Sequence, residues 1–399
     1  MRILFLCLIF LVIILLLAIR RPLYQAITGG LIASVLLYRI PLTAAAVQTS
    51  KVFTNWSSFS VILALYCITY LQRMLESRKQ IKLAQQDLNG IFHNRRINAA
   101  GASLFIGLLP SAAAMILCGD IVKDATEGYL KPREQAFVTS WFRHIPESSL
   151  PTYTGVLLMA SLSGLPLGKF MVGMIIPVIA LFVIGYYPYL SRIPKDPGTP
   201  PSQNRFKDAI NLLKHLWTLL AILVLILGFK LKVVESVALV IAVGAFVYKF
   251  KLSELIPVFK SAFELKLLLN TTLVLVLKEF IAYTGVLEEL PEALAVLPIP
   301  TYLVFALLFF AGTLVSGTSG IIALGTPLAF AAMDGGIPLM VLLMCMTHAA
   351  SQVSPIHVCL VIASEYFNVT LSDLIKETLP RTLLFCLVMI AYYNLMILF

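Results

Sequence analysis

Long apolar segments, separated by short polar stretches, run through almost all of this 399-residue chain. Most are about 17 to 25 residues long, the length that a helix needs to cross a hydrocarbon core of about 30 Å at about 1.5 Å per residue. The pattern predicts an all-α polytopic membrane protein with about ten transmembrane helices. We expect these helices near 3–19, 22–38, 53–76, 136–161, 167–190, 209–229, 233–249, 263–286, 338–365 and 379–398.

Two further apolar segments, 99–121 and 300–333, carry small and polar residues in their middle. We interpret both as re-entrant hairpins, because irregular backbone is tolerated at membrane depth only where protein or a water-filled cavity satisfies it. A charged, proline-rich stretch at 191–208 divides the chain near its middle. The sequence therefore predicts an N-terminal repeat at 1–190, a cytoplasmic linker at 191–208 and a C-terminal repeat at 209–399, each repeat with five crossings and one hairpin.

Lysine and arginine are distributed unevenly over the loops of this topology. Of the 30 basic residues, 22 fall on one set of loops, six on the other, and two, Arg143 and Lys278, within helices. Cytoplasmic loops are the ones enriched in Lys and Arg. We therefore expect an integral protein of the cell (inner) membrane, with the polar loop 77–98 in the cytoplasm and both termini on the extracytoplasmic side. The same placement accounts for the net charge of +10 and argues against nucleic acid as a partner.

The composition supports embedding in a lipid bilayer. Hydrophobic residues make up 59% of the chain and charged residues 13%, against about 45–50% and about 25% in soluble domains. No GxxxxGK[ST] loop is present, so the chain carries no ATP motor of its own. The six cysteines lie within apolar segments and form no CxxC or Cys/His pattern. We interpret them as packing residues and predict no cofactor or metal beyond a candidate Na⁺.

Two proline-containing motifs recur at an offset of 204 residues. His144 is followed seven residues later by Pro151, and His348 is followed at the same distance by Pro355. A polar interruption of the preceding hairpin segment lies 33 residues before the first histidine and 32 before the second. Because each half has an odd number of crossings, the second half is expected to be inverted. Inverted repeats with interrupted helices at matching positions point to the midplane solute site of a transporter.

This plan of two inverted halves, each with a hairpin and a broken helix, resembles the ion transporter (IT) superfamily of carriers and antiporters. The segment from Trp141 to Gly155 is also similar to a family of prokaryotic integral membrane proteins in that superfamily, domain-of-unknown-function family 401. The resemblance implies an elevator-type transporter whose hairpins move against a homodimeric scaffold. Characterised members carry a Ser-Asn-Thr-like triplet at each hairpin tip for Na⁺ and a substrate carboxylate. This chain departs from that triplet, with one hydroxyl, Ser111, at the first tip and a hydroxyl-rich stretch from Ser316 to Ser319 at the second.

Four ionisable residues at the two motifs are the leading site candidates. A charge within a membrane segment is costly unless it is paired, so Glu147 is expected to carry a proton or to pair with Arg143 one turn earlier. Arg143 suits a carboxylate or oxyanion of the solute. The alternatives are an arginine that only neutralises Glu147 or one that reaches the cytoplasmic interface. His144 and His348 are candidate proton carriers, with a simple hydrogen-bonding role as the alternative.

Hydroxyl, amide and proline residues complete the candidate set. Each proline frees a backbone carbonyl one turn earlier, and freed carbonyls beside hydroxyls suit Na⁺ or a solute hydroxyl. A structural kink or a small-residue packing face is the alternative. The candidate Na⁺ site comprises Ser316, Thr318, Ser351 and Ser354. The remaining candidates are Ser111, Ser148, Ser149, Pro151, Ser319, Gln352 and Pro355.

These features predict a secondary active transporter of a small solute, an organic or inorganic anion, coupled to Na⁺ or H⁺. Antiport of a cation against protons is the alternative, since the second hairpin tip resembles segments of some antiporters. An intramembrane enzyme is a third hypothesis, because Ser148 lies four residues from His144. No GxSxG motif or metal triad accompanies that pair, so we do not expect an enzyme.

Overall fold

The structure is a computed structural model that describes residues 1–19, 21–108, 114–196, 202–296 and 298–398. All regular secondary structure within those ranges is helical, which confirms the predicted all-α class. Within the same ranges, four stretches are long and apolar enough to cross a membrane, namely α4 (Trp56–Ser77), Leu167–Arg192, α12 (Arg205–Leu227) and α17 (Thr301–Ala332). The chain is therefore a helical membrane protein.

Several apolar helices are shorter than these four. Five of them, within the described ranges, have only 10 to 17 residues, so the count of ten crossings stays a prediction. The other α-helices are α1 (Arg2–Ala18), α2 (Leu23–Leu37), α3 (Leu42–Thr54), α5 (Gln80–Phe92), α6 (Arg95–Ile106), α7 (Ala114–Thr126), α8 (Pro132–His144), α9 (Thr154–Ser163), α10 (Leu167–Gly173), α11 (Ile175–Tyr189), α13 (Val233–Val247), α14 (Leu252–Ser261), α15 (Leu265–Tyr283), α16 (Leu290–Ala295), α18 (Gly336–Ser351), α19 (Val358–Tyr366) and α20 (Leu371–Met396). Three 3₁₀ turns, η1 (Ile145–Ser148), η2 (Leu190–Arg192) and η3 (Val286–Glu289), complete the set within the described ranges.

Helix α5 occupies most of the segment 77–98, which the sequence pattern predicts to be a polar loop. It packs against α12, where Ala84 and Leu216 share a small buried cluster. A helix with a single apolar face contains no long apolar run, so a search for such runs does not detect it. The same reason explains why α3 and α14, which precede α4 and α15, were not expected.

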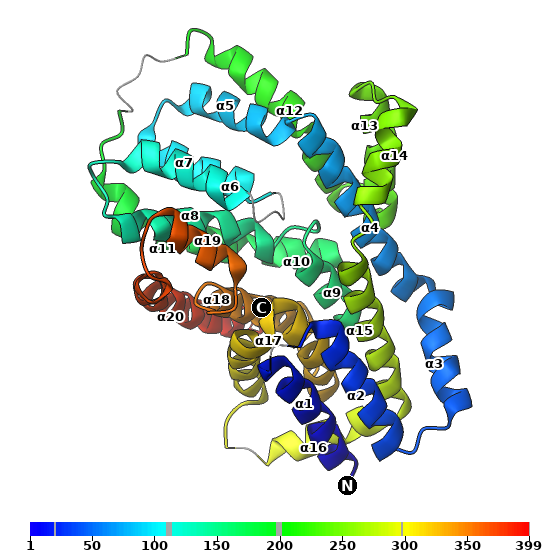
Figure 1. Cartoon of the computed structure of the whole chain (residues 1–399). Coiled ribbons are helices and arrows are strands. Elements are labelled where there is room, and N and C mark those ends of the chain that lie inside the picture. Colours follow the sequence, from blue (N-terminus) through cyan, green and yellow to red (C-terminus); the bar gives the residue numbers. More distant parts are fainter. Residues whose placement is uncertain (20, 109–113, 197–201, 297, 399) are drawn as a thin grey trace.

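Most helices form two groups, which α1, α2 and α5 connect. Figure 1 shows α3, α4 and α13–α15 along one side of the molecule and α6–α8, α11 and α17–α20 on the other, with α12 and α5 across the top. Helix α2 packs on α15, and α1 packs on both α2 and α17. Within the first group, Arg78 donates to both carboxylate oxygens of Glu254 at 3.0 Å, which ties α4 to α14. These hydrogen bonds lower the pKa of the Glu254 carboxyl below its ordinary value.

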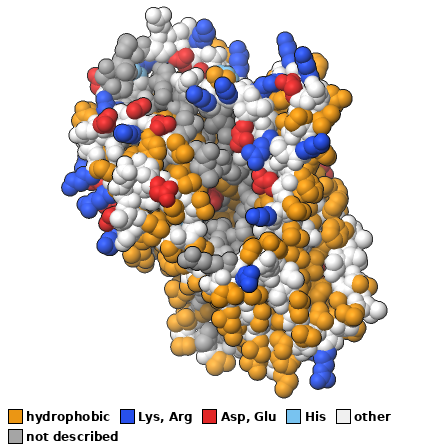
Figure 2. Space-filling view, in the orientation of Figure 1, with side chains coloured by type: hydrophobic (Ala, Val, Ile, Leu, Met, Phe, Trp, Pro, Cys, Tyr) orange, Lys and Arg blue, Asp and Glu red, His pale blue; other side chains and the backbone are white. Residues whose placement is uncertain are grey.

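Charged and apolar surfaces separate along the molecule. In Figure 2, charged side chains gather toward the end where α5, the start of α12 and α14 lie, whereas hydrophobic side chains cover most of the other end. A membrane protein places its charged surface in water and its apolar surface against lipid. The side of the membrane that the charged end faces stays a prediction.

Helix α17 turns back on itself at Gly317. This residue has φ 73° and ψ 170°, a conformation open essentially only to glycine. The two arms that meet there pack against each other, because a Cβ built at Gly312 would overlap the side chain of Ile321, and one at Gly325 would meet Phe309. Positions equally distant from the turn are therefore neighbours, and the arms form an antiparallel pair.

Candidate functional site

The first motif marks an interruption between two helices. Helix α8 ends at His144, the turn η1 covers the next four residues, and α9 begins at Thr154. Pro146 lies inside η1 and Pro151 lies between η1 and α9. A proline lacks the N–H that would continue a helix and disfavours helical backbone in the residue before it. The segment 136–161 is therefore a helix, a break and a second helix.

The second motif interrupts the chain in the same way. Helix α18 ends at Ser351 and α19 begins at Val358, with Pro355 between them. Helix α8 packs on α19, and η1 packs on α18. The rings of His144 and His357 lie 4.8 Å apart between centroids and nearly perpendicular. The two breaks, more than 200 residues apart in the sequence, therefore meet in space.

The end of α6 contacts the first break. A Cβ on Gly107 would overlap the backbone carbonyl of Arg143, so only glycine permits this approach. The Tyr153 hydroxyl, at the start of α9, donates a hydrogen bond to the Gly107 carbonyl. The predicted tip residue Ser111 lies outside the described residues, but the chain leads to it from Gly107.

The turn of α17 contacts the second break. Thr318 and Gly317 line a cavity of about 230 Å³ together with Ser351, Ser354 and His357. Thr313, Ile356 and Val358 complete its lining. A Cβ on Gly155 of α9 would also lie 3.3 Å from the Thr318 methyl group. The second hairpin turn therefore sits beside both breaks.

Arg143 and Glu147 form an ion pair within the first break. The distance from Arg143 Nη1 to Glu147 Oε2 is 3.6 Å, and His144 Nε2 lies 3.8 Å from the same oxygen. The Arg143 side chain is 3% exposed, so it does not reach a water-facing interface. The ion pair with Glu147 is present in the structure, and a role of Arg143 in binding the solute stays a prediction.

Buried polar atoms without a hydrogen-bond partner in the protein gather at the two breaks. In the part of the chain that the structure describes, they include His144 Nε2, Glu147 Oε2, His348 Nε2, Ser354 Oγ and both polar atoms of the Gln352 amide. Gln352 is only 1% exposed. Buried polar groups almost always have partners, and leaving one unpaired costs about 1–3 kcal/mol. A polar ligand, an ion or solvent held here would satisfy these atoms.

A comparison with protein families identifies the relatives of this chain. The profile of the family described as "Protein of unknown function (DUF401)" matches residues 3–395. The chain belongs to the DUF401 family. The likeness of segment 141–155 to that family is thereby confirmed, whereas membership of the ion transporter superfamily stays a prediction. A comparison with curated proteins found no match.

A solved structure shares the fold of this DUF401 protein. It is that of the Alcanivorax borkumensis YdaH transporter, described as having an unusual topology. The two superpose with a TM-score of 0.61, over 89% of this chain and 88% of the other, at 13% sequence identity. At that identity, the likeness concerns the fold alone.

The candidate residues of this DUF401 protein have different local environments. Thr318, Ser351 and Ser354 share the cavity, but Ser316 bonds back to the Gly312 carbonyl and does not line it. Ser148 donates to the Ile145 carbonyl rather than to His144. The remaining candidates vary in burial: Pro151 is buried, Ser149 and Ser319 are partly exposed, and Pro355 is exposed.

One residue at the site was missed from the sequence, and another was placed below the leading candidates. Cys359 and His357, at the start of α19, lie close to His144. The sequence pattern favours a packing role for Cys359, predicts no Cys/His cluster, and makes His357 a weaker candidate than His144 and His348. The local signal was a histidine and a cysteine two residues apart, directly after Pro355. A pattern search along the sequence does not detect a cluster whose third member is over 200 residues away.

A second, larger cavity lies away from the breaks. It has a volume of about 910 Å³ and is lined by parts of α4, α9, α10, α12 and α13. Its lining is mostly apolar, with Lys169, Lys230 and Lys232 as the charged members. No carboxylate or histidine is among them, so we place the candidate site at the breaks rather than here.

Proposed function

We propose that this protein is a secondary active transporter that binds a small solute where the two breaks and the hairpin turns meet. The observation that carries the proposal is the gathering of buried, unpartnered polar atoms beside a cavity of about 230 Å³. Interrupted helices that meet near the middle of a membrane protein are typical of transporter sites. The fold shared with a protein named as a transporter agrees with this assignment.

Matching elements in the two halves support an inverted repeat. A short helix precedes a long one in α3–α4 and again in α14–α15. Helices α6 and α7 pack together, as the two arms of α17 do, and each pair is followed by a broken helix. We propose that α6–α11 and α17–α20 move as a unit, in an elevator motion, against a scaffold of α3, α4 and α12–α15 that forms a homodimer. The proposed setting is the inner membrane, with both termini outside.

Arg143 favours an anionic solute and Glu147 favours proton coupling. Arg143 is always charged and suits a carboxylate or oxyanion. When Glu147 takes up a proton, its attraction for Arg143 falls, and a solute anion can take its place. Release of the proton restores the Arg143–Glu147 pair and expels the anion. Binding of Na⁺ by the hydroxyls of Thr318, Ser351 and Ser354 is the alternative source of coupling.

Two measurements test this function. A thermal-shift screen of the purified protein against organic anions, at several pH values and with or without Na⁺, is expected to show stabilisation by one chemical class. In liposomes, uptake of that anion should follow a pH gradient in the wild type and be abolished in Glu147→Gln, with folding intact. The matched control is Glu279→Gln, which removes a carboxyl group from α15, away from the breaks. Full coupled uptake by Glu147→Gln would exclude the proposed proton carrier.

A cation/proton antiporter is the second candidate. The cavity is lined by the hydroxyls of Thr313, Thr318, Ser351 and Ser354 and by no arginine or lysine, an environment that suits a cation. Dye-quenching assays with Na⁺ and Li⁺ in liposomes separate the two functions. Cation-dependent proton efflux without any effect of anions would replace the first proposal by the second.

An intramembrane enzyme is not supported by the geometry. A serine hydrolase needs its nucleophile within hydrogen-bond reach of a base. The hydroxyl of Ser148 is instead bonded to the Ile145 carbonyl, and the Nδ1 atom of His144 is bonded to the Ser140 carbonyl. We therefore propose a carrier without catalytic residues. Inertness to serine-directed fluorophosphonate probes is the expected result.

A further inference from the structure

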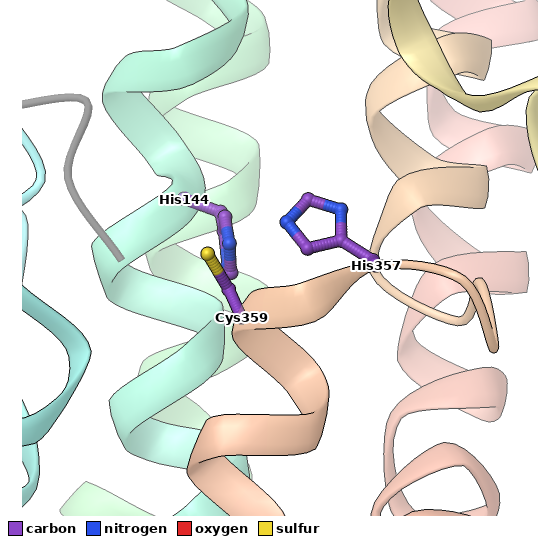
Figure 3. A group of neighbouring side chains, drawn as sticks. All are labelled: His144, His357 and Cys359. Carbon is purple, nitrogen blue, oxygen red and sulfur yellow. The ribbon is translucent and has the colours of Figure 1, made fainter. Parts of the chain in front are cut away.

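Three side chains of metal-binding type converge where the breaks meet. His144 ends α8, whereas His357 and Cys359 begin α19 on the opposite side of the contact, as Figure 3 shows. One ligand atom of each residue lies within 4.8 Å of the other two. Among the residues that the structure describes, this is the one such group of three His, Cys, Asp or Glu side chains.

The hydrogen bonding of His144 prepares one nitrogen to bind a metal. Its Nδ1 lies 2.6 Å from the Ser140 carbonyl oxygen. A carbonyl only accepts, so Nδ1 carries the proton and Nε2 of the neutral ring presents a bare lone pair. That Nε2 is buried and has no hydrogen-bond partner in the protein. Metal-binding histidines are oriented in this way, with the other ring nitrogen donating to a carbonyl or carboxylate.

Glu147 lies beside this group but is not a member of it. Its Oε2 is 3.8 Å from His144 Nε2 and 3.6 Å from Arg143 Nη1, so the arginine already balances its charge. Two ligands of one tetrahedral Zn²⁺ are about 3.5 Å apart, given bond lengths of about 2.0–2.3 Å.

We propose that His144, His357 and Cys359 bind one divalent transition-metal ion, Zn²⁺ by the chemistry of the donors. Two imidazole nitrogens and a thiolate form a donor set that Zn²⁺ prefers. The Cys359 thiol releases its proton as its sulfur binds the ion. The three ligand atoms lie within 4.8 Å of one another, so they would move closer together to share one ion at about 2.0–2.3 Å. The cavity that His357 lines provides the route in.

Three protein ligands leave one position of a tetrahedral ion open for water or a solute atom. The ion would connect the first break, through His144, to the start of α19. Because it binds the folded state and bridges segments distant in sequence, it should stabilise the protein in proportion to its saturation.

The test uses full-length protein in detergent, purified without metal and titrated with Co²⁺ and then Zn²⁺. Cobalt bound by a thiolate in a four-coordinate site gives a near-ultraviolet charge-transfer band and intense visible bands. We expect one Co²⁺ per chain with both features, displaced by Zn²⁺, and a higher unfolding temperature with Zn²⁺. The Cys359→Ser variant should lose the charge-transfer band, while the control Cys67→Ser, which changes a partly buried cysteine of α4, should keep it.

A second test measures the affinity for Zn²⁺. Removing a residue that only hydrogen-bonds to a metal ligand costs about 10- to 100-fold in affinity. His357 is proposed to bind the metal directly, so His357→Ala should weaken Zn²⁺ binding by at least that factor. The control His215→Ala, on α12, should leave it unchanged. If Cys359→Ser fails to fold, the alkylation of each cysteine of the wild type can be measured instead, with and without Zn²⁺. Bound Zn²⁺ should protect Cys359 from alkylation and should not protect Cys67.

The inference is overturned if the wild type gives no charge-transfer band, if the band survives in Cys359→Ser, or if Zn²⁺ leaves Cys359 alkylation unchanged. None of these readouts requires transport. A protein that binds Zn²⁺ but moves no anion refutes the proposed function alone, and an active carrier without the cobalt signature refutes the metal site alone.

Discussion

Gly107 is the residue at which the end of α6 touches the first break, and Gly107→Ala tests that contact. The added Cβ would overlap the Arg143 carbonyl oxygen and lie 2.9 Å from its carbon. Both are backbone atoms, so no side-chain rotation relieves the clash. The backbone of Gly107 is helical, with φ −61° and ψ −10°, which alanine adopts freely. The cost of the substitution is therefore steric alone.

The magnitude follows from the packing. Forcing an extra methyl group into a filled interior costs about 1–3 kcal/mol. Moving α6 away from α8 also strains the hydrogen bond from Tyr153 to the Gly107 carbonyl, which is worth about 0.5–1.5 kcal/mol. We expect Gly107→Ala to destabilise the protein by about 2–4 kcal/mol.

The assay is thermal unfolding of the purified protein in mild detergent. The matched control is Gly168→Ala in α10. The atom nearest to the added Cβ is Leu227 Cδ2 at 3.7 Å, which is an ordinary van der Waals contact. Alanine favours a helix over glycine by about 0.5–1 kcal/mol, so this control should unfold at the wild-type temperature or above it. An unfolding temperature for Gly107→Ala equal to that of the control would falsify the contact between α6 and the break.

Three further predictions concern other parts of the molecule. Gln352→Leu removes two unpartnered buried polar atoms, so it should leave the free energy of unfolding unchanged or raise it by about 1 kcal/mol. The same variant should lose the thermal shift that a bound ligand induces; a large loss of stability would contradict this prediction. Replacing Lys169, Lys230 and Lys232 together by Gln should slow anion uptake about tenfold at low salt and have no effect at high salt, because the positive potential at the larger cavity attracts anions; a salt-independent defect would argue against it. The folded-state pKa of Glu254 is lowered by Arg78, so this carboxylate stabilises the protein at neutral pH and the contribution is lost as the pH falls through the lowered pKa. The unfolding temperatures of wild type and Glu254→Gln should therefore differ at pH 7 and converge on acidification; a difference that grows in acid would have the wrong sign.

The breaks were predictable from the sequence because proline acts locally. Pro151 and Pro355 cannot continue a helix, and the preceding histidines mark where α8 and α18 end or nearly end. The turn of α17 was predictable for the same kind of reason, since Gly317 alone accepts its backbone conformation. Such signals depend on the chemistry of one residue and need no information about distant contacts.

The composition of the site was less predictable because it depends on distant contacts. His144 meets His357 and Cys359 only after α8 has packed on α19. Ser316 and Thr318 are two residues apart, yet the turn at Gly317 leaves the first bonded to its own helix and the second in the cavity. Sequence spacing fixes neither a contact across the fold nor the direction of a side chain at a turn.

The unpartnered polar atoms extend the candidate site from the first break to the second. From the sequence, the charged pair at the first break was the leading candidate. In the structure, four of these atoms belong to three residues of the second break: His348 Nε2, Ser354 Oγ and the amide of Gln352. At about 1–3 kcal/mol each, they cost about 4–12 kcal/mol together, comparable to the whole stability of a typical protein of about 5–15 kcal/mol. The fold tolerates that cost only if something polar satisfies them, so we expect the second break and α17 to bind the solute together with Arg143, while Glu147 controls when it binds.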